Sequence, residues 1–416
     1  MKIQNLPGTR DFYPKEMRTL NYIISSWKKA AEKYGYEEVD APMLEPAELW
    51  KAKGELSEQM YSFKDRGGRE VAIRPEFTPS LARMVAQKQK ELQKPLKWYG
   101  ITRCWRYERP QTGRLREFFQ FNIDCLGIKS MKADAEVITA VVEILKQLKV
   151  TPKEAYIRIS NRKLMKGLLE EIGAENQAEI AKAIDKKDKL NEKEFQELLK
   201  EKGLTSEQAF GLKDILNITD LESLEKQQLN DEAKEGLEEL KELFRYLEMY
   251  GIKEYCELDL SIVRGLDYYT STVFEAFDRS KKFRALAGGG RYENLVEDFG
   301  GEKCPGVGFG MGDVVLQKFL EENNKMPELK SDTDYYIAPI SESVLGDAMK
   351  IAQKLREKYN VEMDLAGKTL KKQLDYANTN CIKKVIILGE KDLEENKVTI
   401  KNMESGKEEK ISIDAL

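Results

Sequence analysis

Residues 106–120 read RYERPQTGRLREFFQ and are the most informative stretch of the sequence. Within residues 97–127 it predicts two antiparallel strands joined by a long loop at residues 110–113, because aromatic, β-prone residues flank a Pro-Gln-Thr-Gly turn. Four arginines lie within the eleven residues 106–116. Arginine suits phosphate because its planar fork donates paired hydrogen bonds and keeps its charge. The stretch therefore indicates either a phosphate-binding loop or surface arginines that pair with Glu108 and Glu117.

Hydrophobic periodicity predicts the elements around this stretch. They are a helix from Pro14 to Gly35, a strand at residues 36–42, a hairpin at residues 60–75, and helices at residues 79–90 and 132–149. Thr78 is expected to cap the helix at residues 79–90, with Pro79 in its first turn.

The second half of the chain changes character twice. Residues 161–250 are rich in Lys, Glu and Leu, which predicts a small helical domain with solvated charged faces. Strand character returns at residues 254–277, a glycine-rich stretch spans 287–312, and a helix follows over 313–323. After a polar linker at residues 324–333, short β runs alternate with helical stretches. That alternation predicts a compact α/β domain with a largely parallel sheet.

The length, net charge and apolar runs of the chain limit the classes of protein to which it can belong. A length of 416 residues predicts two to four domains, and the formal net charge of −4 neither requires nor excludes a nucleic-acid partner. No apolar run approaches the roughly 20 residues of a membrane-spanning helix. No signal peptide is visible at the start, so a cytoplasmic protein without a membrane partner is expected.

Cysteine and histidine usage narrows the chemistry further. The five cysteines form no CxxC motif, which favours free thiols in a reducing compartment. The chain has no histidine, which excludes His-based nucleophilic triads, HExxH sites and His-ligated zinc. No protein-held transition metal is expected.

The sequence of residues 106–120 resembles motif 2 of the class II aminoacyl-tRNA synthetases, in particular that of the histidyl-tRNA synthetases. The resemblance makes Arg106 the arginine that binds the α-phosphate of ATP. It assigns Glu108, Arg114 and Phe118 to the ATP pocket, where Phe118 would stack on adenine. Gln120 and Asp124 are assigned to the histidine pocket, and Gln111 is assigned to a contact with tRNA.

Residues 261–274, SIVRGLDYYTSTVF, resemble the signature peptide of the same family. The alternative is a tyrosine-rich buried strand with one salt-bridged arginine. By resemblance Arg264 is the catalytic arginine, which reaches the α-phosphate where other class II enzymes place a metal. Tyr268 and Tyr269 are then walls of the histidine pocket.

Three further segments match the family. Residues 74–78, RPEFT, resemble the segment that binds the α-ammonium group of the amino acid, a role that falls to Glu76 and Thr78. Residues 287–292, AGGGRY, resemble a second signature peptide, and residues 306–312, GVGFGMG, resemble motif 3. Family members commonly carry Glu-Arg where this chain has Val314-Val315, and that arginine holds the γ-phosphate. By this resemblance the chain lacks the side chain that holds the γ-phosphate in other family members.

Residues 364–378, DLAGKTLKKQLDYAN, resemble the anticodon-binding domain. They are not a P-loop, because position 362 is Glu rather than Gly. Lys368, Lys371 and Lys372 are candidates for contacts with tRNA phosphates, and a solvated helix start is the alternative for each.

Asp124 is the candidate for reading the imidazole ring. A pocket that selects imidazole needs an acceptor at a fixed depth, and a carboxylate is the strongest available. Gln120 and Asp124 are four residues apart, so on a strand they face the same side. The alternative is an ordinary turn aspartate before Gly127.

Taken together, the resemblance implies an α+β protein. The class II catalytic domain, an antiparallel sheet flanked by helices, would cover residues 1–163 and 251–325. A helical insertion at 164–250 would interrupt it, and an α/β anticodon-binding domain would follow at 333–416.

The implied activity is histidine–tRNA ligation with ATP as substrate and Mg²⁺ bridging its outer phosphates. The implied partners are tRNA(His), histidine, ATP and a second copy of the chain, docked through motif 1 near Pro42. The rival from another class is a non-catalytic paralogue, such as the histidine-sensing regulatory subunit of ATP phosphoribosyltransferase. Those paralogues typically lack the terminal domain and have eroded signatures, whereas RGLDYY and RPQTGR are intact here.

Overall fold

The computed structural model describes residues 3–51, 55–263 and 268–416. The chain folds into two compact units, Met1–Met326 and Pro327–Leu416.

An eight-stranded sheet forms the centre of the first unit, with the strand order β1-β5-β6-β11-β10-β9-β7-β8. Its strands are β1 Glu37–Glu38, β5 Leu96–Trp105, β6 Glu117–Leu126, β7 Ala155–Asn161, β8 Cys256–Leu258, β9 Thr272–Asp278, β10 Ala287–Tyr292 and β11 Gly306–Gly312. The two outer pairs, β1 with β5 and β7 with β8, are parallel, and the strands between them are antiparallel. The predicted pair of long antiparallel strands around residues 106–120 is confirmed as β5 and β6.

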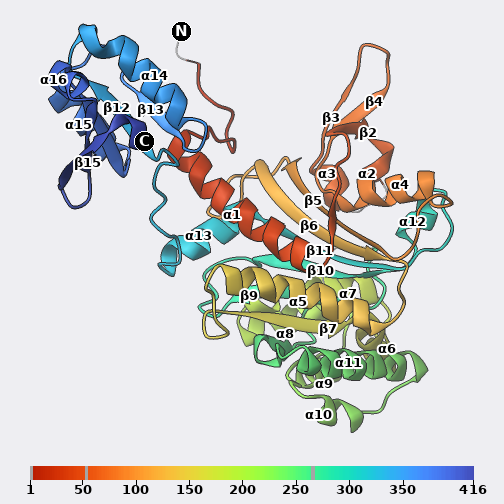
Figure 1. The fold of residues 1–416 in the computed structure, drawn as a ribbon. Helices are drawn as coiled ribbons and strands as arrows, with labels where there is room; N and C mark the ends of the chain where they lie inside the picture. The colour runs from red at the N-terminus through yellow and green to blue at the C-terminus, as the bar shows by residue number, and fades with distance from the viewer. Residues whose placement is uncertain (1–2, 52–54, 264–267) are drawn as a thin grey trace. The chain divides into compact units, whose positions relative to one another are not determined.

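Helices cover both faces of this sheet. α1 (Pro14–Lys33), α5 (Met131–Gln147) and α13 (Asp313–Glu322) pack on one face (Figure 1). Apolar side chains fill this interface, and the rings of Trp27 and Phe121 stack there. On the other face α4 (Thr78–Lys88) and the short α12 (Leu295–Asp298) pack over a smaller cluster that includes Phe77 and Leu126. The predicted antiparallel sheet flanked by helices is therefore confirmed.

The remaining elements of the first unit flank this sheet. A small sheet of order β2-β4-β3 is built from β2 Leu44–Pro46, β3 Tyr61–Lys64 and β4 Glu70–Ile73, with α2 Glu48–Lys51 and α3 Glu55–Glu58 beside it. The predicted hairpin at residues 60–75 is β3 and β4. The strand predicted at 36–42 is wrong in extent: only Glu37 and Glu38 pair with β5, because the chain leaves the sheet at once towards β2.

The lysine- and glutamate-rich middle segment is helical, as predicted. Its helices are α6 Arg162–Glu171, α7 Gln177–Ile184, α8 Glu192–Glu201, α9 Ser206–Leu216, α10 Leu221–Glu225 and α11 Asp231–Met249. Their apolar faces continue the main hydrophobic core, and α11 packs on α5 and α6.

The second unit is a five-stranded sheet of order β13-β12-β14-β15-β16. Its strands are β12 Tyr335–Pro339, β13 Val361–Met363, β14 Lys384–Leu388, β15 Lys397–Asn402 and β16 Glu408–Ser412, and its helices are α14 Leu345–Leu355, α15 Leu370–Thr379 and α16 Glu390–Glu394. The three predicted β runs pair in parallel, but β15 and β16 add an antiparallel hairpin that the sequence analysis missed. These two strands are mostly polar and bury few side chains, so their hydrophobic signal is weak.

Candidate active site

Three polar side chains on β6 face one cavity. Gln120, Asn122 and Asp124 alternate along the strand and therefore lie on the same face of the sheet. The neighbouring strand β11 presents a glycine opposite each of them, because Gly312 pairs with Gln120, Gly310 with Asn122 and Gly308 with Asp124. The alternating glycines of residues 306–312 thus clear the floor beneath the three polar groups.

Gly308 is required by close approach. A Cβ atom at this position would lie 2.2 Å from Oδ1 of Asp124 and 2.5 Å from the backbone oxygen of Ile123. Contacts of that length do not occur in folded proteins, so any larger residue would displace the carboxylate or the strand. The glycine therefore sets the depth at which Asp124 sits.

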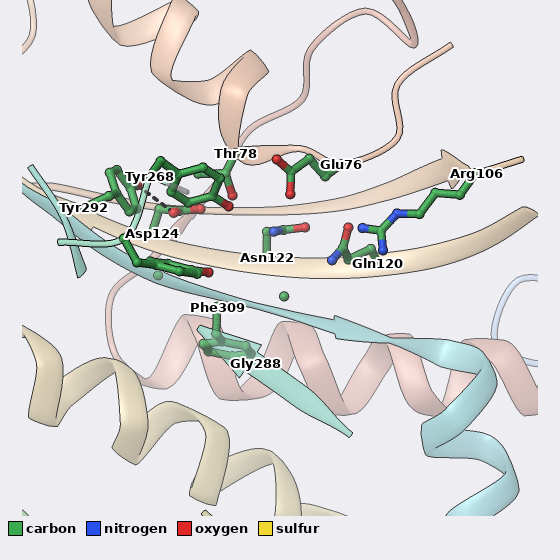
Figure 2. A pocket seen from close by; sticks show the side chains of 13 residues that line it. Glu76, Thr78, Arg106, Gln120, Asn122, Asp124, Tyr268, Gly288, Tyr292 and Phe309 are labelled. Atoms are coloured by element: carbon green, nitrogen blue, oxygen red, sulfur yellow. Dashed lines mark hydrogen bonds between the residues drawn. The ribbon is translucent and has the colours of Figure 1, made fainter. Parts of the chain in front are cut away.

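The cavity that the three polar side chains of β6 face has a volume of about 150 Å³. Figure 2 shows Asp124, Asn122 and Gln120 in a row, with Tyr268, Thr78 and Glu76 above them and Arg106 at one end. The lining consists of Glu76, Thr78, Arg106, Gln120, Asn122, Asp124, Tyr268, Tyr269, Gly288, Tyr292, Gly308, Phe309 and Gly310. One end is aromatic and the other carries the arginine, which suits a ligand with a ring at one end and an anion at the other.

Asp124 has the electrostatics of a recognition group. It is only 1% exposed, and burial raises the pKa of its carboxyl to about 8, against the opposing effect of a hydrogen bond from Tyr292. The nearby Glu76 carboxylate also raises this pKa. The Tyr292 hydroxyl donates to Oδ1 at 2.7 Å, whereas the buried Oδ2 has no hydrogen-bond partner. A ligand that brings a proton donor to Oδ2 would satisfy this atom and favour the ionised carboxylate.

Tyr292 is itself held by its neighbour in the sequence. The guanidinium of Arg291 is buried and donates to the Asp134 carboxylate on α5, to the backbone oxygen of Ile128 and to that of Ser130. This contact fixes the end of β10 against α5. The Tyr292 hydroxyl therefore meets Asp124 from a rigid support.

Aromatic side chains wall the Asp124 end of the cavity. The rings of Tyr268 and Tyr269 lie 4.8 Å apart, and Tyr268 meets the ring of Tyr292 edge-on at 6.0 Å. Phe309, on β11, borders the cavity, but its ring packs against Phe121 in the core on the other face of the sheet. The tyrosine walls accommodate a planar, partly apolar ring.

The opposite wall comes from the segment between β4 and α4. Glu76 and Thr78 are both buried and both line the cavity. The expectation that Thr78 caps α4 is wrong, because Thr78 is the first residue of the helix and Phe77 holds the cap position without a side-chain cap bond. The Thr78 side chain is turned to the cavity instead. Arg74 anchors this segment by donating to Asp40 and to the backbone oxygen of Ala41.

Arg106 marks the far end of the cavity. Its Nε donates to the backbone oxygen of Pro75 at 3.0 Å, and its guanidinium lies 5.2 Å from the centre of the Phe118 ring. Glu108 and Arg114 lie outside the cavity lining and form an ion pair with each other. The loop closes through paired backbone hydrogen bonds between Gln111 and Arg114, which leaves the Gln111 side chain exposed.

Two positions that the sequence linked to phosphate binding are Arg264 and Val315. Arg264 lies outside the described residues. Val315, at which the family resemblance leads one to expect an arginine, places its Cγ2 atom 3.4 Å from where a Cβ on Gly113 would be. The valine therefore packs beneath the loop between β5 and β6.

Sequence reasoning missed part of the cavity lining, namely Asn122, Tyr292 and Phe309. The alternation that placed Gln120 and Asp124 together also places Asn122 between them, so its signal was present. Tyr292 stands in the quoted segment AGGGRY but is brought to Asp124 only by the pairing of β10 with β11. No group of three or more Cys, Asp or Glu side chains suited to a metal ion occurs within residues 3–51, 55–263 and 268–416.

A second hollow lies in the C-terminal unit, at the carboxyl ends of the parallel strands β12 and β13. It has a volume of about 510 Å³ and its lining includes Ile340, Asp364, Leu365 and Lys368. The buried Asp364 accepts a hydrogen bond from the backbone N–H of Lys368 at 2.7 Å and so fixes the loop that carries the exposed Leu365. Lys371 and Lys372 are exposed at the start of α15 and do not line the hollow.

Comparisons with known proteins agree with this geometry. A family model of histidyl-tRNA synthetase matches residues 8–313, and one of an anticodon-binding domain matches residues 334–416. Histidine–tRNA ligase from Haloarcula marismortui is 38% identical over 99% of this chain and 96% of its own length. The enzyme of that name from Leptospira biflexa is 40% identical, over 97% of this chain and 93% of its own.

A solved structure extends the likeness to three dimensions. The crystal structure of histidyl-tRNA synthetase from Nostoc superimposes with a TM-score of 0.87 at 25% identity, covering 100% of this chain and 98% of that one. Sequence and fold therefore agree over nearly the whole length, and the chain belongs to the histidyl-tRNA synthetases.

Proposed function

We propose that the cavity on β6 binds histidine in one orientation. The imidazole ring lies among the aromatic walls with a ring nitrogen donating to Asp124, and the ammonium group lies near Glu76 and Thr78. The carboxylate then points past Gln120 towards Arg106. The observation that carries this proposal is the buried, unpartnered Oδ2 of Asp124 at the aromatic end of the cavity.

The proposed chemistry follows from this orientation. A carboxylate oxygen of histidine attacks the α-phosphorus of ATP. The bond between the α-phosphorus and the oxygen that bridges to the β-phosphate breaks, and histidyl-adenylate and pyrophosphate form. A ribose hydroxyl at the 3′ end of tRNA(His) then attacks the histidyl carbonyl and AMP leaves. Negative charge grows on the α-phosphate in the first step, so preorganised cations are the main catalytic requirement. Arg106 and Arg264 are proposed for that role.

ATP is proposed to lie along the outer end of the cavity. Phe118 offers a ring for adenine beside Arg106, and the ion pair of Glu108 with Arg114 borders the same loop. Mg²⁺ is expected to arrive as part of the ATP substrate, bound to the outer phosphates. Its neutralising charge is especially needed here, because Val315 supplies no cation.

Asp124→Asn is expected to raise KM for histidine far more than KM for ATP. The amide still accepts a hydrogen bond but loses the charge, a loss of roughly 1–3 kcal/mol that corresponds to about 5- to 150-fold in KM. Tyr269→Phe is expected to show the same selectivity more mildly. Histidine-dependent ATP–pyrophosphate exchange, with each substrate varied in turn, measures both constants. An unchanged histidine dependence in Asp124→Asn would mean that another group reads the imidazole.

The C-terminal unit is proposed to bind the anticodon of tRNA(His). Lys368 lies beside a hollow with exposed apolar side chains, and Lys371 and Lys372 extend the positive charge along α15. Gln111, exposed on the loop of the first unit, is proposed to contact the same tRNA. The helical segment 164–250 is proposed to be an insertion within a catalytic domain formed by residues 1–163 and 251–325, followed by the anticodon-binding domain at 333–416.

Removal of residues 333–416 is expected to leave histidine activation largely intact and to abolish efficient tRNA charging. The cavity and its supports lie entirely within the first unit, which has its own hydrophobic cores. Pyrophosphate exchange and aminoacylation are measured on the same preparation. Equal losses in the two assays would show instead that the C-terminal unit supports the catalytic site.

The chain is proposed to act as a homodimer through the segment near Pro42. Met43, Leu44 and Phe63 expose apolar side chains on the small sheet, and a partner surface would remove them from water. Light scattering at micromolar concentration is expected to give twice the chain mass of 47.9 kDa. A mass of one chain would rule out this dimer.

The cytoplasm is the proposed location. No helix among the described residues has the length and apolar character needed to cross a membrane. The non-catalytic paralogue is disfavoured, because the residues that line the histidine cavity occur together with a matched anticodon-binding domain.

A further inference from the structure

We propose that Asn122 is a substrate-binding residue whose side-chain oxygen accepts a hydrogen bond from the α-ammonium group of histidine. The inference rests on the proposed histidine site and adds a residue to it. It concerns the middle of the cavity, between the groups assigned to the imidazole and those assigned to the carboxylate.

The side chain of Asn122 is buried without being satisfied. The residue is 3% exposed, lines the cavity and leaves its Oδ1 atom without a hydrogen-bond partner. Buried polar atoms in native proteins almost always have a partner, and an orphan at a ligand cavity points to a group that the ligand supplies. The only other buried, unpartnered oxygen on this face of β6 is Oδ2 of Asp124.

The spacing of these two oxygens matches the substrate. Asp124 and Asn122 are two residues apart on one strand, which separates their side chains by about 6.5 Å. A histidine whose ring nitrogen meets Asp124 therefore places the atoms around its Cα near Asn122. Figure 2 shows the Asn122 amide below Glu76 and between Asp124 and Gln120.

The chemistry of the ammonium group selects the acceptor. An ammonium has three N–H donors and no acceptor, so it is fully satisfied by three oxygens in different directions. Glu76 and Thr78 supply two of them from one wall of the cavity, and Asn122 supplies the third from β6. A neutral amide oxygen adds this bond without placing a third carboxylate beside Glu76 and Asp124.

Gly310 leaves room for the amide. A Cβ on Gly310 would lie 2.3 Å from Nε2 of Gln120 and 3.4 Å from Nδ2 of Asn122. The amide nitrogen of Asn122 is therefore close to β11. The side-chain oxygen is buried without a hydrogen-bond partner, and the inference assigns it to the ligand.

Two histidine analogues separate the ammonium from the imidazole. Histidinol keeps the ring and the ammonium but lacks the carboxylate, and 3-(imidazol-4-yl)propionate keeps the ring and the carboxylate but lacks the ammonium. Their inhibition constants against histidine are measured in pyrophosphate exchange, with wild type, Asn122→Leu, Asn122→Asp and Asp124→Asn. Thermal melting establishes that each variant is folded.

Asn122→Leu is expected to raise the inhibition constant of histidinol about tenfold or more, because only histidinol donates a hydrogen bond to the lost oxygen. It is expected to change the inhibition constant of imidazolepropionate by less than about threefold. Asp124→Asn, the matched control at the ring end, is expected to weaken both. Asn122→Asp keeps an acceptor, so it is expected to retain the binding of histidinol and to weaken the binding of imidazolepropionate. If the leucine variant fails to fold, Asn122→Asp tests the inference by itself.

Equal weakening of both analogues by Asn122→Leu, an unchanged histidinol constant, or loss of both analogues in Asn122→Asp would each overturn the inference. Failure of wild type to show any histidine-dependent exchange is a different result, because it would reject the proposed function itself.

Discussion

Arg106→Ala is expected to slow histidine-dependent pyrophosphate exchange by about 100- to 1000-fold, the usual loss when one preorganised charge-stabilising donor is removed. Arg106 lies at one end of the cavity, where we propose that the histidine carboxylate and the α-phosphate meet. Its Nε bond to Pro75 holds the side chain in place before substrate arrives, so no reorganisation is needed during the reaction. Arg106→Lys is expected to recover only part of the rate, because an ammonium lacks the paired fork.

Arg264→Ala is expected to lose adenylate formation to a similar degree, by its place in RGLDYY. Arg103→Ala is the matched control for both. Arg103 lies three residues before Arg106 but faces the other side of the sheet, where it pairs with Glu117 at 2.9 Å and covers Phe119. Exchange near the wild-type rate in a folded Arg106→Ala or Arg264→Ala protein would remove that arginine from the proposed mechanism.

Gly308→Ala is expected to reduce kcat/KM for histidine by about 100-fold or more, because misplacement of a recognition group by about 1 Å has effects of that size. The added methyl group would lie 2.2 Å from the Asp124 carboxylate and 2.5 Å from the backbone of Ile123, and the second contact cannot be relieved by a side-chain rotation. The carboxylate must therefore move or the pairing of β6 with β11 must open.

The same strand offers a control for this substitution. A Cβ on Gly312 would meet no atom within 4 Å, so Gly312→Ala adds the same methyl group without a clash. It is expected to leave KM for histidine and the melting temperature close to wild type. If Gly308→Ala and Gly312→Ala behaved alike in both measurements, the close approach of Gly308 to Asp124 would have no functional role.

Much of the site could be predicted from local sequence rules. A two-residue period on a strand is enough to place Gln120 and Asp124 on one face, and a proline–glycine turn between aromatic runs is enough to predict β5 and β6. The resemblance of residues 306–312 to motif 3 also indicated the segment that became β11. These features depend on the chain within a few residues of each position.

The rest depends on contacts between distant segments. Tyr292 reaches Asp124 over 168 positions of sequence, and only the order of strands in the sheet brings them together. Thr78 carries a good local signal for a helix cap, but the packing of its segment turns the side chain to the cavity. The replacement of the motif 3 arginine by Val315 was visible in the sequence, whereas the packing of that valine against Gly113 was not.

The most direct test is ATP–pyrophosphate exchange by the purified chain with each of the standard amino acids supplied singly. Exchange is expected with histidine alone, to depend on Mg²⁺, and to be followed by histidylation of tRNA(His) when tRNA is added. Exchange that is absent with histidine, or equal with another amino acid, would contradict a histidine–tRNA ligase built around the Asp124 cavity.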